Sequence, residues 1–306
     1  MTGLSMLQRA LLVLLLCWVS GACSIERYAK HRLADALSES GSTFASDNDP
    51  DLVREAAPFS LKLMETLLSA TPEHDQLLVA VTRGFTQYSW AFVQQDAERM
   101  ESTDLAAAEH LRLRAQRLYL RARDYGLRAL EVRYPGLGQE LRAAPRDATA
   151  KLRREDTELA FWLGAAWGGA LTQAKDSPEL LADQAIVEAL FDAVLALDEG
   201  FESGAMHAVL IAYERSRPGG ARNWIERARK HFQRAVELSE GRVAAPYVAL
   251  AESVAVQEQR LAEFEDLLAR ALAIDPDVVP TKRLENCIYQ ARARWLLARK
   301  DELFLE

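Results

Sequence analysis

Cysteine is scarce in this chain, which limits how the chain can be cross-linked. Only three cysteines occur in 306 residues, and Cys17 and Cys23 both fall within the first 23. Cys287 is then the single thiol of the body, which excludes an internal disulfide and a cysteine zinc site there. Its place on an apolar helical stripe predicts that it packs in the core.

Motifs that carry catalysis or bind cofactors are also missing. There are five scattered histidines: His31, His74, His110, His207 and His231. None of them forms an HExxH pair, and no GxSxG, P-loop or GxGxxG sequence occurs. The sequence therefore predicts a protein that is not an enzyme and has no cofactor or metal. Asp47–Asp51 begins like a calcium loop, but Leu52 and Pro58 replace the Gly and Glu that such a loop needs, which favours a helix-capping loop.

Positive charge is in the minority. The chain has 37 Lys and Arg against 45 Asp and Glu, a net charge of −8. Because an acidic chain repels phosphate backbones, nucleic acid is excluded as an expected partner.

No apolar run is long enough to span a bilayer. Residues 10–19 form a run of ten, and the uncharged stretch 159–171 has 13 residues, whereas a membrane helix needs about 20. The first run, inside a segment whose only charge is Arg9, predicts a signal peptide at residues 1–22. The second contains Gly164-x3-Gly168 and predicts a core helix with close backbone contact.

The end of the predicted signal peptide carries a cysteine after small residues. Val19-Ser20-Gly21-Ala22-Cys23 resembles the lipobox of bacterial lipoproteins, where the thiol receives a diacylglycerol. The resemblance implies an exported, periplasmic protein anchored through lipid on Cys23. Ser24, in place of the Asp that retains lipoproteins in the inner membrane, favours the outer membrane. Ser20 departs from the commonest residue, Leu, and ordinary cleavage that leaves a free Cys23 is the alternative.

The remainder of the chain has helical periodicity and no strand alternation. Residues 25–39 place apolar side chains on one stripe, which predicts a short amphipathic helix within an anchor segment, residues 23–50. Breakers such as Pro72, Pro178 and Pro276 then divide residues 51–306 into segments whose lengths suit helical hairpins. The sequence predicts an all-α fold.

Several predicted helices end with the same pattern. Ala228, Phe232 and Ala235 align with Phe264, Leu268 and Ala271, and Val194 ends a similar segment. The spacing resembles the second helix of a tetratricopeptide repeat. The predicted fold is therefore a stack of degenerate tetratricopeptide-like helix–turn–helix repeats, forming an α-solenoid or a compact superhelix.

Aromatic residues mark one candidate binding site. Phe85, Tyr88, Trp90 and Phe92 fall within eight residues, and helical spacing places the first, second and fourth on one face. With Trp162 and Trp167 they are predicted to line an apolar cleft for a ligand or a partner. Packing in the core is the alternative.

A basic segment marks a second candidate. Arginines make residues 104–133 basic, among them Arg112, Arg114, Arg117, Arg121, Arg123 and Arg128. Interleaved acids suggest a solvated helical face, and docking of an acidic partner is the alternative interpretation.

Strings along most of the chain resemble one protein family, the T component (TatT) of tripartite ATP-independent periplasmic (TRAP) transporters. They include Ser42–Asp47, Pro58–Lys62, Gly84–Tyr88, Arg121–Leu127, Ala165–Gly168, Ile211–Glu214 and Arg294–Leu297. One departure is Ala208-Val209, where the family pattern has Glu-Phe.

The resemblance implies a periplasmic lipoprotein of cryptic tetratricopeptide hairpins. It also implies a homotrimer with a central pore that associates with the periplasmic solute-binding subunit, and a hydrophobic or organic-acid ligand. The expected function is that of an accessory component of a TRAP-type uptake system, attached to the membrane only through its lipid. The alternatives are a ligand-free envelope scaffold and an enzyme such as an envelope hydrolase.

Overall fold

The computed structural model describes residues 28–39, 41–173, 178–217 and 222–305. All regular secondary structure in these segments is helical, so the all-α prediction is confirmed. The predicted signal peptide and Cys23 lie outside the described residues. Within the described part of the chain, no helix is both long and apolar enough to cross a membrane.

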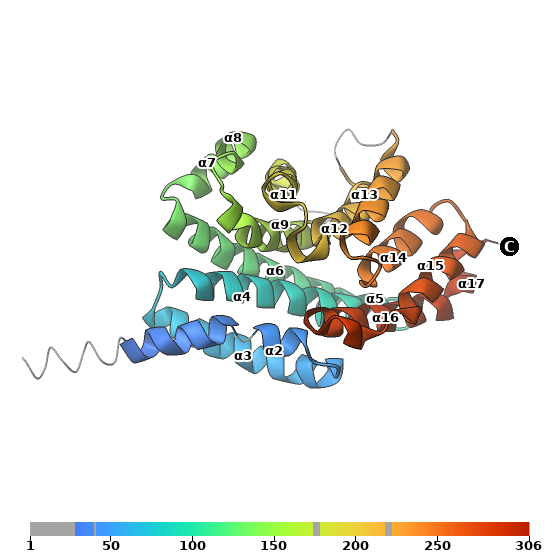
Figure 1. The fold of residues 1–306 in the computed structure, drawn as a ribbon, viewed down its shortest axis with the longest axis horizontal. Helices are drawn as coiled ribbons and strands as arrows, with labels where there is room; N and C mark the ends of the chain where they lie inside the picture. Colours follow the sequence, from blue (N-terminus) through green and yellow to red (C-terminus); the bar gives the residue numbers. More distant parts are fainter. Residues whose placement is uncertain (1–27, 40, 174–177, 218–221, 306) are drawn as a thin grey trace, which may run out of the picture.

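The N-terminal half builds long helices around a common core (Figure 1). After the helix at residues 28–39 come α2 (Gly41–Ala45), α3 (Pro50–Ala70), α4 (Asp75–Tyr88), η1 (Ser89–Gln94), α5 (Gln95–Met100), α6 (Leu105–Arg133), α7 (Leu137–Ala143), α8 (Pro145–Thr149), η2 (Arg154–Asp156), α9 (Thr157–Thr172), α10 (Pro178–Leu181) and α11 (Gln184–Asp198).

Shorter helical hairpins follow in the C-terminal half. They are η3 (Phe201–Ser203), α12 (Ala205–Tyr213), α13 (Trp224–Leu238), α14 (Ala245–Leu250), η4 (Ala251–Ala255), α15 (Leu261–Ala273), η5 (Pro276–Val278), η6 (Pro280–Lys282), α16 (Arg283–Ala298) and α17 (Lys300–Leu303).

Aspartates begin the two longest helices. The Asp49 carboxylate accepts hydrogen bonds from the backbone N–H groups of Asp51 and Leu52 at the start of α3. The Asp104 carboxylate accepts from the N–H of Ala107 at the start of α6. Such caps satisfy N–H groups that have no partner inside the helix. The helix-capping interpretation of Asp47–Asp51 is therefore confirmed.

The main core lies where α6 crosses α4 and α9, and α9 packs in turn on α11. Glycines allow the close approaches. A Cβ on Gly126 of α6 would lie 3.0 Å from Leu163 of α9, and a Cβ on Gly164 would lie 3.0 Å from Phe191 of α11. The uncharged stretch 159–171 is thus a core helix with close contacts, as predicted.

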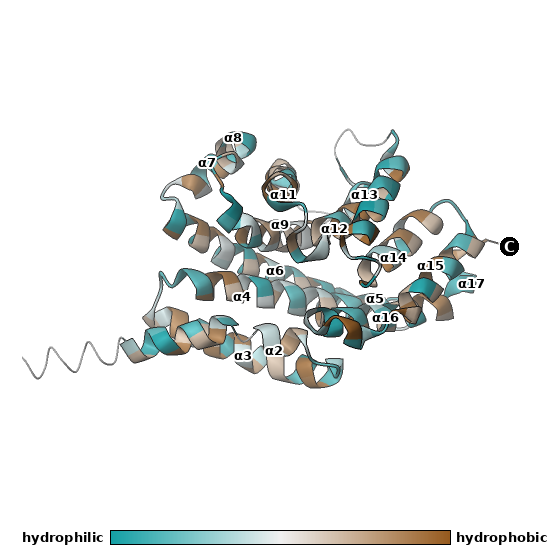
Figure 2. Ribbon diagram, in the orientation of Figure 1, coloured by the Kyte–Doolittle hydropathy of each residue, from teal (hydrophilic) through white to brown (hydrophobic). Residues whose placement is uncertain are grey.

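The C-terminal hairpins form a second core. α12 packs on α13 and α14, α14 on α15, and α15 on α16. Ala228, Ala235 and Ala271, aligned in the sequence, are all buried. Along α13 and α15, hydrophobic and hydrophilic residues interchange, because one face of each helix packs inward (Figure 2).

α16 returns to the start of the fold and touches α2 and α3. The two halves therefore meet, and the stack is a compact superhelix instead of an open solenoid (Figure 1). The contact brings residues from both ends of the chain together around α5, η1 and η4.

Two π-helical turns depart from the regular periodicity. η1 follows α4 directly, and η4 follows α14. A π turn inserts an additional residue, so side chains after it are rotated relative to an ordinary helix. Beyond Tyr88, the positions predicted from a period of 3.6 no longer hold.

Candidate functional site

The aromatic residues singled out in the sequence lie in different parts of the core. Phe85 and Trp167 are buried in the main core, and Phe92 is buried in a small cluster with Val53 and Ile288. Tyr88, Trp90 and Trp162 are half-buried. The six side chains therefore do not form one continuous apolar surface.

Each of these rings has its own neighbour. Trp90 packs on Tyr289 of α16 with the ring centroids 4.7 Å apart, and Tyr88 packs on Phe92 at 5.5 Å. Trp162 meets the edge of Phe161 at 4.8 Å. The Trp167 indole N–H donates to Asp183 at 3.1 Å. Such contacts are those of packing residues, and a binding role for these aromatics stays a prediction.

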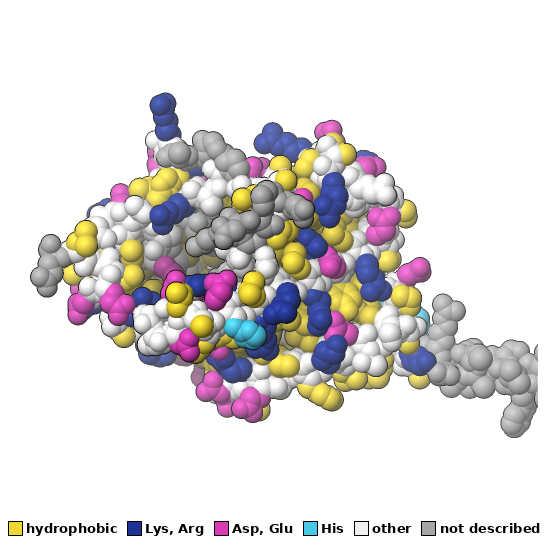
Figure 3. Space-filling model, turned by 180° about the vertical axis from the view of Figure 1, so that it is seen from behind, with side chains coloured by type: hydrophobic (Ala, Val, Ile, Leu, Met, Phe, Trp, Pro, Cys, Tyr) yellow, Lys and Arg dark blue, Asp and Glu magenta, His cyan; other side chains and the backbone are white. Residues whose placement is uncertain are grey.

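Phe85 of the main core packs against residues that line a groove on the surface of α6. The groove has a volume of about 370 Å³. Its lining residues all lie on α6: Arg117, Leu120, Arg121, Asp124, Tyr125 and Arg128. We call it the α6 groove. It belongs to the basic segment noted in the sequence, and Lys and Arg side chains gather near the middle of the face shown in Figure 3.

Beneath the α6 groove lies a stack of rings and guanidinium groups. The Phe85 and Tyr125 rings lie nearly parallel with centroids 6.4 Å apart. The Arg121 guanidinium lies 5.4 Å from the Phe85 centroid, and that of Arg128 lies 5.7 Å from the Tyr125 centroid. Cations prefer the faces of aromatic rings, so the arrangement holds both arginines over a rigid base.

Glu65 of α3 supports this base from the side. The Tyr125 hydroxyl donates to Glu65 Oε1 at 2.9 Å. Burial and this hydrogen bond raise the pKa of Tyr125 to about 12, although Arg128 and Arg121 oppose the shift. Tyr125 is a neutral hydrogen-bond donor near neutral pH, as an ordinary tyrosine is.

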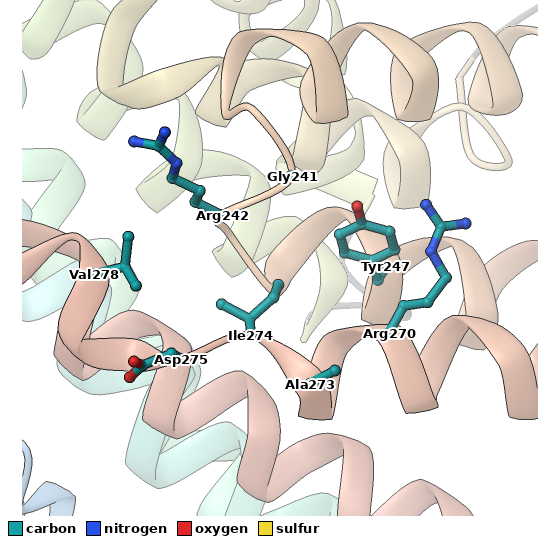
Figure 4. Close-up of a pocket in the computed structure, with 8 residues that line it drawn as sticks. All are labelled: Gly241, Arg242, Tyr247, Arg270, Ala273, Ile274, Asp275 and Val278. Atoms are coloured by element: carbon teal, nitrogen blue, oxygen red, sulfur yellow. The ribbon is translucent and has the colours of Figure 1, made fainter.

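A second pocket, of about 340 Å³, lies between the start of α14 and the end of α15. Figure 4 shows the Tyr247 ring and Arg270 together on one side of Ile274, while the Arg242 guanidinium points away on the other. The Arg270 guanidinium lies 4.7 Å from the Tyr247 centroid, and Arg242 pairs with Glu240 at 2.7 Å. The Arg242 and Arg270 guanidinium groups point in different directions and so cannot bind one small anion together. This pocket is therefore the weaker candidate.

A chain of four titratable side chains links α11, α12 and α13. His207 Nε2 lies 3.1 Å from Glu199 Oε1, and His207 Nδ1 lies 2.8 Å from His231 Nδ1. His231 Nε2 lies 3.6 Å from Glu214, which is fully buried. One Nδ1 must donate and the other must accept, so the histidine pair holds only while one of these two atoms is unprotonated.

Arginines surround this chain. Arg234 pairs with Glu199, whereas Arg217 and Arg227 pair with Glu214. Burial lowers the pKa of His207, although the Glu199 carboxylate opposes it. Burial, and then the charge of His207, lower the pKa of His231. Nothing in the spacing of the histidines signals the pair, because His207 and His231 are 24 residues apart.

Comparison with known proteins identifies the family. The model of the TRAP transporter T-component family matches residues 46–304. The chain belongs to this family. The match begins before α3 and runs through α17, so it covers both cores and the α6 groove. A protein of Treponema pallidum (strain Nichols), described as uncharacterized, is similar to this chain. The two are 29% identical over an alignment 314 residues long, which covers 95% of each chain.

Ala208 and Val209, the positions where the sequence resemblance suggested a departure, directly follow His207 of the histidine pair. Both residues lie on α12 and are half-buried, and Val209 packs against the main core. Neither lines the α6 groove or the second pocket. The two residues therefore belong to the packing around His207 and lie outside both candidate sites.

The histidine pair predicts a loss of stability in mild acid. The folded pKa values of His207 and His231 lie below the usual value of about 6.5. Near and below pH 6.5, these two histidines bind protons more readily in the unfolded chain than in the folded protein. The free energy of unfolding should therefore fall as the pH decreases from about 7 to 5. The pKa of Glu199 is lowered to about 2, chiefly by Arg234, so its own contribution is lost only in stronger acid.

Melting temperatures at the two pH values test this expectation. His231→Asn should flatten the dependence, whereas His110→Asn, at an exposed position on α6, should leave it unchanged. Equal losses in wild type and His231→Asn would contradict the assignment.

Proposed function

We propose that this chain is an exported, lipid-anchored accessory component of a TRAP-type solute uptake system, and that it docks the system's periplasmic solute-binding subunit. The observation that carries the proposal is the family match over residues 46–304. A compact superhelix with a basic groove on one long helix supports it, because a rigid, exposed surface suits protein docking.

The ligand that such a component would hold or pass is apolar or an organic acid. The burial of Phe85, Phe92 and Trp167 removes support for a cleft at those residues. The second pocket, where Tyr247 and Arg270 border Ile274 and Val278, has the mixed character that an organic acid needs. A scaffold without ligand is the competing function, and the burial of these aromatics favours it.

Isolation from membranes tests the proposal. The lipidated protein, purified from detergent-solubilised membranes, should carry the solute-binding subunit with it, and mass spectrometry should identify both proteins and any small molecule. Sedimentation of the same sample should show three copies if the homotrimer implied by the family is present. Recovery of envelope assembly proteins without any TRAP subunit would favour the scaffold.

Lipidation gives a separate prediction. Cys23→Ala should release the protein from membranes into the soluble periplasm, because a single residue would carry the whole anchor. Fractionation and the intact mass of the protein are the measurements. The anchor hypothesis is wrong if the variant stays with membranes and the wild-type protein carries no acyl mass.

A further inference from the structure

The α6 groove carries more positive charge than the carboxylates in and beside it balance. Its lining contains three arginines, Arg117, Arg121 and Arg128, against one carboxylate, Asp124. Asp124 pairs with Arg123, at 2.8 Å, and not with the lining arginines. Among the carboxylates of the described segments, Arg121 reaches Glu65 alone, at 3.7 Å, and Glu65 already accepts from Tyr125.

Two of the arginines on the outer face of α6 donate hydrogen bonds to backbone carbonyls. Arg117 donates to the Leu113 carbonyl and Arg128 to the Pro72 carbonyl. Among the described residues, no carboxylate lies within ion-pair distance of Arg114, Arg117 or Arg128. By contrast, Arg112 and Arg133 at the two ends of α6 each pair with two carboxylates. Three arginines for which the described residues provide no ion-pair partner therefore lie along the central part of one helix.

Apolar side chains lie beside these cations. Leu113 is 47% exposed, Leu120 lines the groove, and Tyr125 forms part of its base. Interfaces combine such aromatic and arginine anchors with apolar contact. Arg114 and Arg128 are separated by about 21 Å along the helix axis at 1.5 Å per residue. A partner must therefore present carboxylates over about that length together with apolar residues.

This chemistry fits an acidic amphipathic segment of a protein better than a small anion, which could not reach along the row. We propose that the α6 groove is the docking surface for an acidic, partly apolar segment of the solute-binding subunit. The inference rests on the proposed function, since it names the surface through which that function acts.

Affinity measurements with charge-reversed variants test the surface. Titration calorimetry would compare the full-length lipoprotein with Arg117→Glu and with Arg117→Glu/Arg121→Glu, each against the purified solute-binding subunit. We expect the double variant to bind roughly tenfold to a hundredfold more weakly, because the two glutamates would repel the acidic segment of the partner. Higher salt should weaken wild-type binding more than binding by the double variant.

Arg117→Glu guards against a failure to fold, because Arg117 is exposed and its hydrogen bond in the described structure is to the Leu113 carbonyl of the same helix. Arg294→Glu on α16 is the matched control: it reverses the same charge at an exposed arginine that, within the described residues, has no carboxylate at ion-pair distance. It should bind like wild type. A photo-crosslinking phenylalanine at Leu113 should attach to a segment of the solute-binding subunit rich in Asp and Glu.

Other results would overturn the inference. If the α6 variants and Arg294→Glu bind the subunit equally well, the docking surface lies elsewhere while the proposed function stands. If wild type does not bind the subunit, the proposed function fails and the surface fails with it. Crosslinks from Leu113 to a second copy of this chain would identify a self-association surface. Arginine-dependent binding to phosphatidylglycerol vesicles, with affinity for the subunit unchanged, would identify a membrane surface.

Discussion

Trp167→Ala should lower the free energy of unfolding by about 3–5 kcal/mol, the usual range when a large aromatic is removed from a packed core. Trp167 is fully buried in the main core, and its indole N–H donates to Asp183. Arg123 and Arg142 lie over its ring at 5.4 and 5.7 Å. Truncation would leave a cavity, remove the indole hydrogen bond to Asp183, which keeps its ion pair with Arg142 at 3.6 Å, and leave two arginines without their ring.

Chemical denaturation of the two tryptophan variants of α9 measures the effect. Trp162→Ala is the matched control, because Trp162 lies on the same helix and is only half-buried. It should cost less than Trp167→Ala. A loss below about 1 kcal/mol for Trp167→Ala, accompanied by weaker binding of an apolar ligand, would restore the cleft hypothesis in place of core packing.

Arg292→Leu should destabilise the fold by about 3 kcal/mol, near the lower end expected when one partner is removed from a buried ion pair. Arg292 of α16 is 7% exposed. Its guanidinium pairs with Glu98 of α5 at 2.7 Å and donates to Glu252 of η4 at 2.8 Å. The lower end applies because the two carboxylate side chains keep 27% and 37% exposure.

This arginine connects the N-terminal helices to the C-terminal hairpins. Burial by itself would lower its pKa, but Glu252 and Glu98 raise it above the ordinary value. The loss should be measurable by denaturation, and adding Glu98→Gln and Glu252→Gln to Arg292→Leu should recover part of it, since no carboxylate is then left unpaired. Arg294→Ala, at an exposed position of the same helix, should change stability by less than about 0.5 kcal/mol. An equal effect of Arg292→Leu and Arg294→Ala would show that the three-residue contact does not hold the halves together.

Local features of the fold could be predicted from the sequence because their causes are local. Asp49 and Asp104 begin helices through bonds to N–H groups two or three residues away. Ala235 and Ala271 are buried as their aligned spacing predicted, since a small side chain suits a position where two helices approach. The basic character of residues 104–133 was equally visible, since all the arginines belong to one helix.

The role of the aromatics could not be predicted in the same way. An apolar side chain is suited equally to a core and to a ligand cleft, so composition does not distinguish them. The π turn of η1 then changes the direction of every side chain after Tyr88, and Trp90 meets Tyr289 near the other end of the chain. Only the packing of α16 against the first helices decides that contact.

The sequence by itself determined the helical class, the helix starts and the basic helix. The export and lipidation signals that it contains stay predictions. The tertiary structure alone decided that Phe85 lies beneath Arg121 and Tyr125, that His207 meets His231, and that Arg292 joins Glu98 to Glu252. The physical reason is the range of the interactions. Hydrogen bonds within a helix turn and side-chain volume act between near neighbours, whereas charge pairing and burial depend on which distant helices the superhelix brings together.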